Sequence, residues 1–535
     1  MSNFSRTPVL SVLLCSTALF LAGCTVKPEP IALGKHMERA QLDMDEIYKS
    51  IAPLENKLTL SDAIARGLLF NLDHQMIMME RVLQDGQLTL ANFNMLPRLA
   101  ANAGYKSRSD VRASKSIGLK SGTVSLEDSY SEERDVINAD LTLSWNLLDF
   151  GLSYFQSKQQ ADRVMTAVER RRKVMNNMVK EVMVSYWKAA SAEQHLPQVE
   201  RLLIEVKGAL KTSKKIEDKD LLSPKALLEY RRNLLQVSFQ LKQLKGEMAM
   251  AKAQLATLIN VPPNQKFTLA KPTASAKKLP KIKTKMAELQ NYGLVYRPEL
   301  REEAYQEKID KQNINKEILR MFPGLSILGS VNHDSNEYLY YQNWGEFTTR
   351  ATWNLVNLIQ GPTAIKNAKM QVEISKMRRL ALTAAVLGQV SISYTQYHQS
   401  MDNFQTAEQL SHIEQKMLKI AEDQKRANKG TRLEEIQISA RYIAAELDQS
   451  RALVDAKTAL YNLMASVGVD FVPADTETKD LSEMTDIVSN ALSQMEEGKI
   501  DQWLKLPVVP EAEEVIKKSE NRPALIIVDA PYSAG

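Results

Sequence analysis

The feature that most constrains this chain is an internal duplication. The stretch 67–70 (GLLF) recurs at 293–296 (GLVY), the stretch 145–147 (WNL) recurs at 353–355, and the apolar-periodic segment 227–258 recurs at 433–464. Repeats of roughly 200 residues are duplicated domains, because solenoid units are several times shorter. We therefore predict a first repeat at 58–262, a linker at 263–285 and a second repeat at 286–470.

The N-terminus has the pattern of an export signal. Arg6 precedes an apolar run at 9–21, which has the length of a signal-peptide core and is too short to span a membrane as a helix. The run ends in Leu-Ala-Gly-Cys at 21–24, which resembles the lipobox of bacterial lipoproteins. We therefore expect residues 1–23 to be a lipoprotein signal peptide that is removed during export.

Cleavage at this point would leave Cys24 as the first residue of the mature chain. In lipoproteins this cysteine carries acyl chains such as palmitate, and each buried CH₂ group contributes about 0.8 kcal/mol to membrane binding. We expect a lipid anchor on Cys24 and an anchored linker at 24–57. Thr25 stands where an aspartate would resemble an inner-membrane retention signal, so an outer-membrane destination is favoured.

Each repeat also carries two stretches in which apolar and polar residues alternate, at 98–106 and 137–147 and again at 325–332 and 346–355. Period-two alternation over about ten residues is typical of a strand with one wet face, and a tilted strand of this length crosses a bilayer. The alternative is a half-buried sheet in a soluble domain. The lipid anchor and the polar loop 107–136 favour the membrane.

The alternation also assigns a face to each strand residue. The residues predicted to face lipid are Leu141, Leu143, Trp145 and Trp353, and those predicted to face a water-filled lumen are Asp140, Thr142 and Arg350. Four strands cannot close a barrel, and each unsatisfied backbone group in lipid costs several kcal/mol, so the protomer must oligomerise. Two copies would give eight strands with little bore, whereas three copies would give twelve.

The rest of each repeat is predicted to be long helix. Apolar residues in 227–258 step by three and four without a break, which is a heptad seam that packs against a neighbouring helix. The same register in 433–464 has only Ser450 and Lys457 as polar positions. The preceding runs, 154–212 and 363–428, also read as helix, and ~58 residues of helix extend about 85 Å.

Composition and the remaining motifs argue against several classes of protein. A net charge of +5 over 535 residues gives little reason to expect nucleic-acid binding, and two cysteines exclude a disulfide framework. The six histidines show no metal-ligand spacing, and no phosphate-binding loop is present. The charged run 169–173 (ERRRK) is interpreted as a solvated helix face. We expect no enzymatic activity, no metal and no cofactor.

Taken together, these features resemble the outer-membrane efflux proteins of the TolC family over about residues 58–470. The resemblance depends on 58–64 (LTLSDAI), 145–151 (WNLLDFG) and 430–432 (GTR), in this order on a duplicated frame. It implies a fold that is mainly α with a membrane β-barrel contribution: four strands and long helical hairpins in each protomer. It further implies a homotrimer with a twelve-stranded barrel in outer-membrane lipid and a periplasmic tube of helices.

The resemblance also implies a function and a gate. The chain would be a passive conduit for small molecules such as drugs, supplied by an inner-membrane transporter through a periplasmic adaptor protein. Arg432, Glu434 and Glu435 follow the Gly-Thr-Arg turn and are predicted to form the periplasmic gate. The sequence departs from the family here, because Ile436 and Ser439 stand at the positions aligned with its aspartate pair.

Two alternatives stay open at this point. Type I protein secretion uses the same parts as drug efflux, although lipidation leans towards efflux. A different class of function is a lipid-anchored helical scaffold that bridges the envelope layers without conducting. Residues 471–535 are expected to be a periplasmic tail, for which the sequence indicates no role.

Overall fold

The computed structural model describes residues 29–49, 54, 57–217, 224–262, 265–271, 279–427, 432–473, 476, 478 and 480–497. The chain divides into two units, Met1–Pro53 and Leu54–Gly535. Within the first unit, helix α2 (Leu33–Lys49) is amphipathic. The predicted signal peptide and Cys24 lie outside the described residues.

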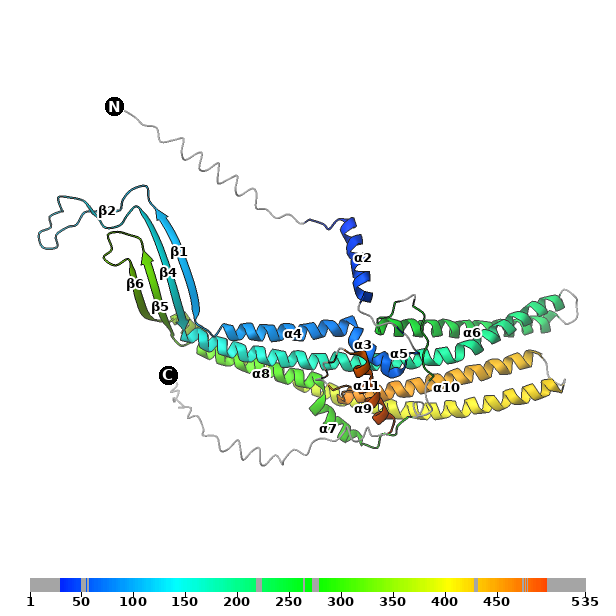
Figure 1. Ribbon diagram of the computed structural model, residues 1–535. Helices are drawn as coiled ribbons and strands as arrows, with labels where there is room; N and C mark the ends of the chain where they lie inside the picture. Colours follow the sequence, from blue (N-terminus) through cyan, green and yellow to red (C-terminus); the bar gives the residue numbers. More distant parts are fainter. Residues whose placement is uncertain are drawn as a thin grey trace. The chain divides into compact units, whose positions relative to one another are not determined.

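In the second unit, four antiparallel strands form one sheet, as the alternation predicts. Strand β1 (Arg98–Ser107) pairs with β4 (Asp135–Asn146), β4 with β5 (Gly324–Asp334), and β5 with β6 (Asn343–Thr352). A small hairpin of β2 (Ala113–Ser114) and β3 (Ser129–Tyr130) lies in the long β1–β4 connection. Each repeat therefore contributes one pair of strands, and the pairs join through β4 and β5 (Figure 1).

The order of the helices around these strands also repeats. The first half contains α3 (Leu60–Phe70), α4 (Leu72–Phe93), α5 (Leu147–Glu217) and α6 (Pro224–Leu258). The second half contains α7 (Met286–Tyr296), α8 (Pro298–Leu319), α9 (Leu355–Arg426) and α10 (Arg432–Val467). None of the helices in the described part of the chain is both long and apolar enough to cross a membrane.

The two longest helices exceed the predicted lengths. α5 has 71 residues and α9 has 72, because each begins directly after a strand, at Leu147 and Leu355, which the alternation had placed in the strands. At a rise of 1.5 Å per residue, each helix extends about 105 Å. The helical half of the molecule is therefore longer than the sequence pattern indicated.

The repeated Trp-Asn-Leu motif marks the change from strand to helix. The side-chain oxygen of Asn354 accepts a hydrogen bond from the N–H of Val356 at 3.1 Å and caps α9. Asn146 accepts from the N–H of Leu148 at 2.9 Å in the same way. The predicted strand position of Trp353 is wrong, because β6 ends at Thr352.

The heptad seams form part of the core. The seam residues Leu234 and Leu241 of α6 are buried and share one hydrophobic cluster with Ile436 and Ile443 of α10. This cluster continues along α5, and its burial confirms the predicted coiled-coil packing. A fully buried side chain of this size stabilises the fold by about 1.5–3 kcal/mol.

Helix α11 (Leu481–Glu496) lies within the segment interpreted as a tail. Its stripe of Met484, Val488, Leu492 and Met495 is buried in the central hydrophobic cluster, and the helix lies against α3. Spacings of three and four residues place these side chains on one helix face. This part of the segment is therefore integral to the core of the second unit.

Candidate functional site

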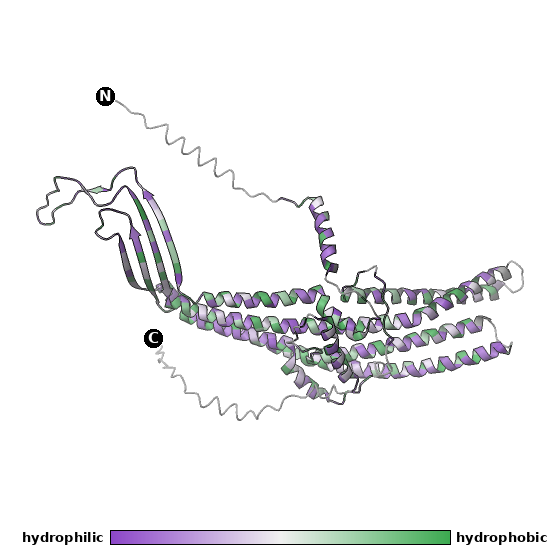
Figure 2. Ribbon diagram, viewed as in Figure 1, coloured by the Kyte–Doolittle hydropathy of each residue, from purple (hydrophilic) through white to green (hydrophobic). Residues whose placement is uncertain are grey.

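The sheet has a polar face, and its strand register determines which residues share it. Asn146 on β4 lies opposite Ser326 on β5, which lies opposite Arg350 on β6. Asp140 and Thr142 precede Asn146 on β4 by even numbers of residues, so they point to the same side. The three residues predicted to face a lumen therefore share one face, and Figure 2 shows the alternation along the strands.

Hydrogen bonds connect neighbouring strands across this polar face. Asp140 accepts from the side-chain amide of Asn102 on β1 at 2.9 Å and from the hydroxyl of Thr142 at 2.8 Å. The amide of Asn146 donates to the hydroxyl of Ser326 at 3.0 Å. The face therefore presents an ordered polar surface rather than isolated polar side chains.

The opposite face of the sheet is apolar and uncovered. Leu141 and Leu143 are each 48% exposed, and Phe347 on β6 is 74% exposed. Trp145, half-buried at the end of β4, packs edge-on against Phe150 of α5 with ring centroids 5.6 Å apart. An apolar surface this extended indicates contact with lipid or with another protein.

The sheet is also open at both edges. Strands β1 and β6 each pair on one side only within the described residues. An edge strand presents a row of unpaired N–H and C=O groups, which serves as a template for pairing with another chain. The sheet is therefore suited to continue into further copies of itself.

The predicted gate lies where α9 ends and α10 begins. Arg432 is the first residue of α10, and the turn at 428–431 lies outside the described residues. Across this turn, the ammonium group of Lys425 on α9 lies 2.5 Å from a carboxylate oxygen of Glu435, whereas Glu434 is exposed. Ile436 is fully buried, so this departure from the family's acidic pair is a core position.

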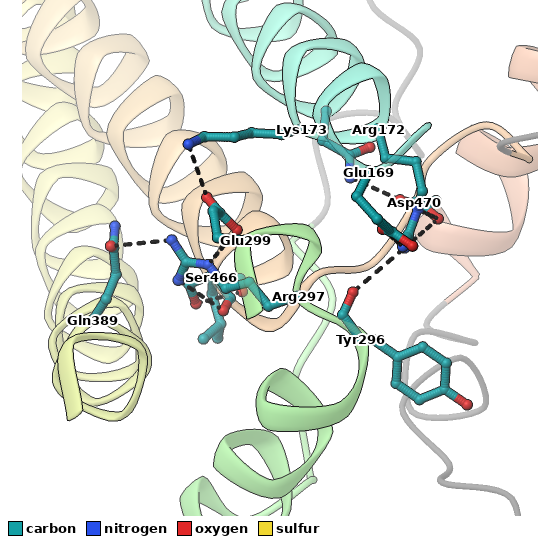
Figure 3. Close-up of polar contacts among 11 residues, drawn as sticks. Glu169, Arg172, Lys173, Tyr296, Arg297, Glu299, Gln389, Ser466 and Asp470 are labelled. Carbon is teal, nitrogen blue, oxygen red and sulfur yellow. Dashed lines mark hydrogen bonds and ion pairs between the residues drawn. The ribbon is translucent and has the colours of Figure 1, made fainter. Parts of the chain in front are cut away.

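The run 169–173 on α5 joins the two repeats. Only Arg170 and Lys173 are exposed, so the prediction of a solvated face is wrong for the other three residues. Glu169 and Arg172 are 2% and 6% exposed. The guanidinium of Arg172 lies 2.5 Å from a carboxylate oxygen of Glu169 and 2.8 Å from one of Asp470, which follows α10 (Figure 3). The guanidinium of Arg301 on α8 lies 2.9 Å from a carboxylate oxygen of Glu169. We call Glu169, Arg172, Arg301 and Asp470 the inter-repeat cluster.

The electrostatics of the inter-repeat cluster follow from this pairing. Burial opposes the charge of Arg172, but the carboxylates of Asp470 and Glu169 outweigh it and raise the pKa of the guanidinium above its ordinary value. A second contact region lies beside the cluster, where Arg297 bonds Glu299 at 3.0 Å and the carbonyl of Ser466 at 3.2 Å (Figure 3). Sequence reasoning missed both regions, because each depends on a partner from the other end of the chain or the other repeat: Asp470 and Arg301 in the first, Ser466 in the second.

The two polar positions of the α10 seam both meet α5. Ser450 lies 2.9 Å from Nε2 of the buried His195, and the ammonium group of Lys457 lies 4.2 Å from the ring centroid of Trp187. Burial lowers the pKa of Lys457 to about 8. A polar residue at a single seam position specifies which helices pair and in what register. Both polar positions of the α10 seam are therefore matched by polar or aromatic contacts on α5.

A groove of about 370 Å³ lies between α6 and α10, with α5 as its floor. Met248, Leu244 and Leu447 contribute apolar surface, and Glu247 of α6 forms an ion pair with Arg451 of α10 at the same groove. The lining combines apolar side chains with charged ones, and a groove of this composition between helices can accept an amphipathic helix.

Two helices carry long apolar stripes that the rest of the protomer does not cover. On α4 the exposed apolar residues are Leu72, Met76, Met79, Val82, Leu83, Leu90 and Phe93. On α9 they include Met370, Met377, Leu380, Ile392, Ile413 and Ile420. Exposed stripes of this length mark protein–protein interfaces.

Solved structures with the same architecture identify the class of fold. The CmeC outer membrane channel of Campylobacter jejuni matches with a TM-score of 0.63 at 11% identity, over 80% of this chain and 89% of that one. The open state of the MtrE outer membrane channel of Neisseria gonorrhoeae matches with a TM-score of 0.61 at 18% identity, over 78% and 91%. The outer membrane protein VceC of Vibrio cholerae matches with a TM-score of 0.57 at 12% identity, over 76% and 96%.

The chain therefore has the fold of outer-membrane channels. This likeness confirms, at the level of the fold, the resemblance to the TolC family drawn from the sequence motifs. No family model matches the sequence, and no curated protein matches it.

Proposed function

We propose that this protein is the outer-membrane channel of a tripartite export system and conducts small molecules such as drugs passively out of the cell. The observation that carries the proposal is the sheet, which combines a polar face, an exposed apolar face and two open edges. A sheet of this kind is stable in lipid only when its edges are closed. It continues directly into helices of about 105 Å, long enough to form a periplasmic tube.

The proposed assembly is a homotrimer with a twelve-stranded barrel. Strand β6 of one copy pairs with β1 of the next, and the apolar stripes of α4 and α9 meet between copies. In this arrangement Leu141, Leu143 and Trp145 face lipid, whereas Asp140, Thr142 and Arg350 line the lumen. Trp353, which follows the last strand, lies near the membrane boundary.

The remaining assignments belong to the same proposal. Residues 1–23 are removed, Cys24 carries the lipid anchor, and 24–57 links the anchor to the first repeat. The groove between α6 and α10 accepts an amphipathic helix of the periplasmic adaptor, which connects the channel to an inner-membrane transporter. Arg432, Glu434 and Glu435 gate the periplasmic end, and the chain after residue 470 stays in the periplasm.

The test is reconstitution of the purified, lipidated protein in a planar bilayer. We expect trimers that resist dissociation in detergent and give discrete current steps at single-channel dilution. Assembled trimers that insert without conducting would contradict the proposal and favour a scaffold.

A second experiment separates small-molecule efflux from protein secretion. Deletion of the gene should increase susceptibility to several unrelated antibiotics, and expression of the intact protein should restore resistance. Unchanged susceptibility, together with loss of one secreted protein from the medium, would favour type I secretion.

A further inference from the structure

A cavity of about 670 Å³ lies where the sheet meets the helices. It is open to solvent and is lined by the end of α4, the start of α5 and the helix-proximal ends of the four strands. Its strand residues on the polar face are Arg98, Ser144, Asn146, Ser326, Leu328, Arg350 and Thr352. We call this space the basal cavity, and its size is within the range of small-molecule sites.

The basal cavity holds two arginines that nothing in the described chain neutralises. Arg98 on β1 and Arg350 on β6 both line it, and neither forms an ion pair or a side-chain hydrogen bond within the described residues. Asp149 is the one carboxylate among the lining residues, so the net charge of the lining is positive. An unpaired guanidinium is a strong donor for a carboxylate or a phosphate, which it binds through two parallel hydrogen bonds.

The cavity also supplies uncharged donors beside these arginines. The hydroxyls of Ser144 and Thr352 and the amide of Asn94 belong to its lining. A few convergent polar groups around a charged residue are the usual composition of a site that orients a ligand.

The positions of the two arginines in the sheet strengthen the argument. Arg98 and Arg350 lie on the two edge strands, near the same end of the sheet. When β6 of one copy pairs with β1 of the next, the strands that carry them become neighbours about 4.8 Å apart. Three copies then place six guanidinium groups in one band, whose mutual repulsion an anion relieves.

We propose that Arg98 and Arg350 form an anion-binding ring at the base of the channel, which selects solutes that carry a carboxylate or a phosphate. The inference rests on the proposed channel function and adds the chemical class of its solutes. An anionic solute meets the ring where the helical tube opens into the barrel, and the fixed positive charge raises its local concentration there.

The experiment uses the purified, lipidated trimer and inorganic tripolyphosphate as the probe. In planar bilayers at low salt, tripolyphosphate should block the current. The double variant Arg98→Gln/Arg350→Gln should need about tenfold more tripolyphosphate for the same block. Under a potassium chloride gradient, its reversal potential should shift towards cation selectivity.

The matched control is Lys106→Gln. Lys106 lies on the same face of β1 at the opposite end and is already paired with Glu132, so its loss should leave the block unchanged. Arg98→Lys/Arg350→Lys retains the charge and should preserve the selectivity. If the double glutamine variant does not assemble, the two single variants provide the same comparison.

Calorimetry of tripolyphosphate binding to the trimer in detergent separates this inference from the proposed function. Binding that depends on both arginines, in a protein that does not conduct, would support the ring and contradict the channel. The wild type and the glutamine variants could instead all conduct, with the same block, selectivity and binding. That result would overturn the anion-binding ring and leave the proposed channel function intact.

Discussion

Arg172 and Asp470 join the two halves of the duplicated chain. The guanidinium on α5 lies 2.8 Å from the carboxylate that follows α10, and Asn176 donates to the other oxygen of the same carboxylate at 2.8 Å. The residues of this pair are 298 positions apart in the sequence. The contact therefore depends on both repeats being folded.

Removal of the carboxylate should destabilise the protein. Asp470→Ala leaves the buried Arg172 with the carboxylate of Glu169 and the carbonyl of Tyr296 as its partners, and should lower the free energy of unfolding by about 3 kcal/mol. Denaturant unfolding monitored by helical circular dichroism measures this change. Arg170→Ala is the control, because Arg170 is 60% exposed and its one ion pair among the described residues is with Glu302, so it should cost about 1 kcal/mol or less. Equal losses in both variants would contradict the role of the inter-repeat cluster.

The buried Lys457 should make stability depend on pH. Burial lowers its pKa from 10.5 to about 8, so between these values the unfolded chain binds more protons than the native one. Stability from this group therefore rises as pH increases from 8 to 10.5. Lys457→Met should stabilise the protein at pH 7 by roughly 3 kcal/mol, and this advantage should shrink above pH 8. A stabilisation by Lys457→Met that does not change with pH would show that the charge of Lys457 is not its cause.

Strand orientation can be tested with single cysteines. Thr142→Cys should react with a small polar thiol reagent in intact trimers, whereas Leu143→Cys should resist it. The two native cysteines, Cys15 and Cys24, lie in the predicted signal peptide and at the predicted lipidation site, so the background should be low. Reaction at Leu143→Cys with protection at Thr142→Cys would mean that the two faces are reversed.

Charge placed on the apolar face should impair assembly in the membrane. Leu143→Arg should reduce the yield of trimer, at a cost that is about 2–4 kcal/mol at the middle of the bilayer and smaller towards the end of β4 where Leu143 lies. The amount of assembled trimer can be measured on unheated gels of outer-membrane extracts. Thr142→Arg, one residue away on the polar face, is the matched control and should assemble normally.

The gate proposal predicts a gain of conductance. In the proposed trimer, symmetry would bring three copies of the α9–α10 connection together, and an arginine there could hold a carboxylate of a neighbouring helix through two hydrogen bonds. Arg432→Ala should therefore raise single-channel conductance and admit larger antibiotics at unchanged trimer yield. Wild-type conductance in assembled trimers of this variant would place the constriction elsewhere.

The lipid anchor predicts loss of acylation in one variant. Cys24→Ser should abolish the incorporation of labelled palmitate and change the mobility of the protein, whereas Cys15→Ser should leave both unchanged. Export activity should only weaken, because a closed barrel stays inserted in the membrane without the lipid anchor. Normal labelling of the Cys24→Ser protein would contradict the lipobox assignment.

Periodic features of this protein could be read from the sequence because they are local. Alternation along Asp140–Asn146 sets the two faces of β4 whatever its neighbours are, and the heptad steps through Leu234 and Leu241 require only some partner helix. The motif at 145–147 also has a local cause, since Asn146 caps the helix that follows it. The four strands and the long helices were predicted for these reasons.

Tertiary structure alone decided the rest. The run 169–173 has the composition of a solvated face. Arg172 and Glu169 are nevertheless buried, because the other repeat supplies Asp470 as a partner for Arg172 and Arg301 as a partner for Glu169. The stripe on α11 became core because the central cluster offered it an apolar surface. Arg98 and Arg350 likewise line one basal cavity because strand pairing places them on opposite edges of one sheet. Charge pairing and burial depend on which distant segments come into contact, and a local sequence pattern does not contain that information.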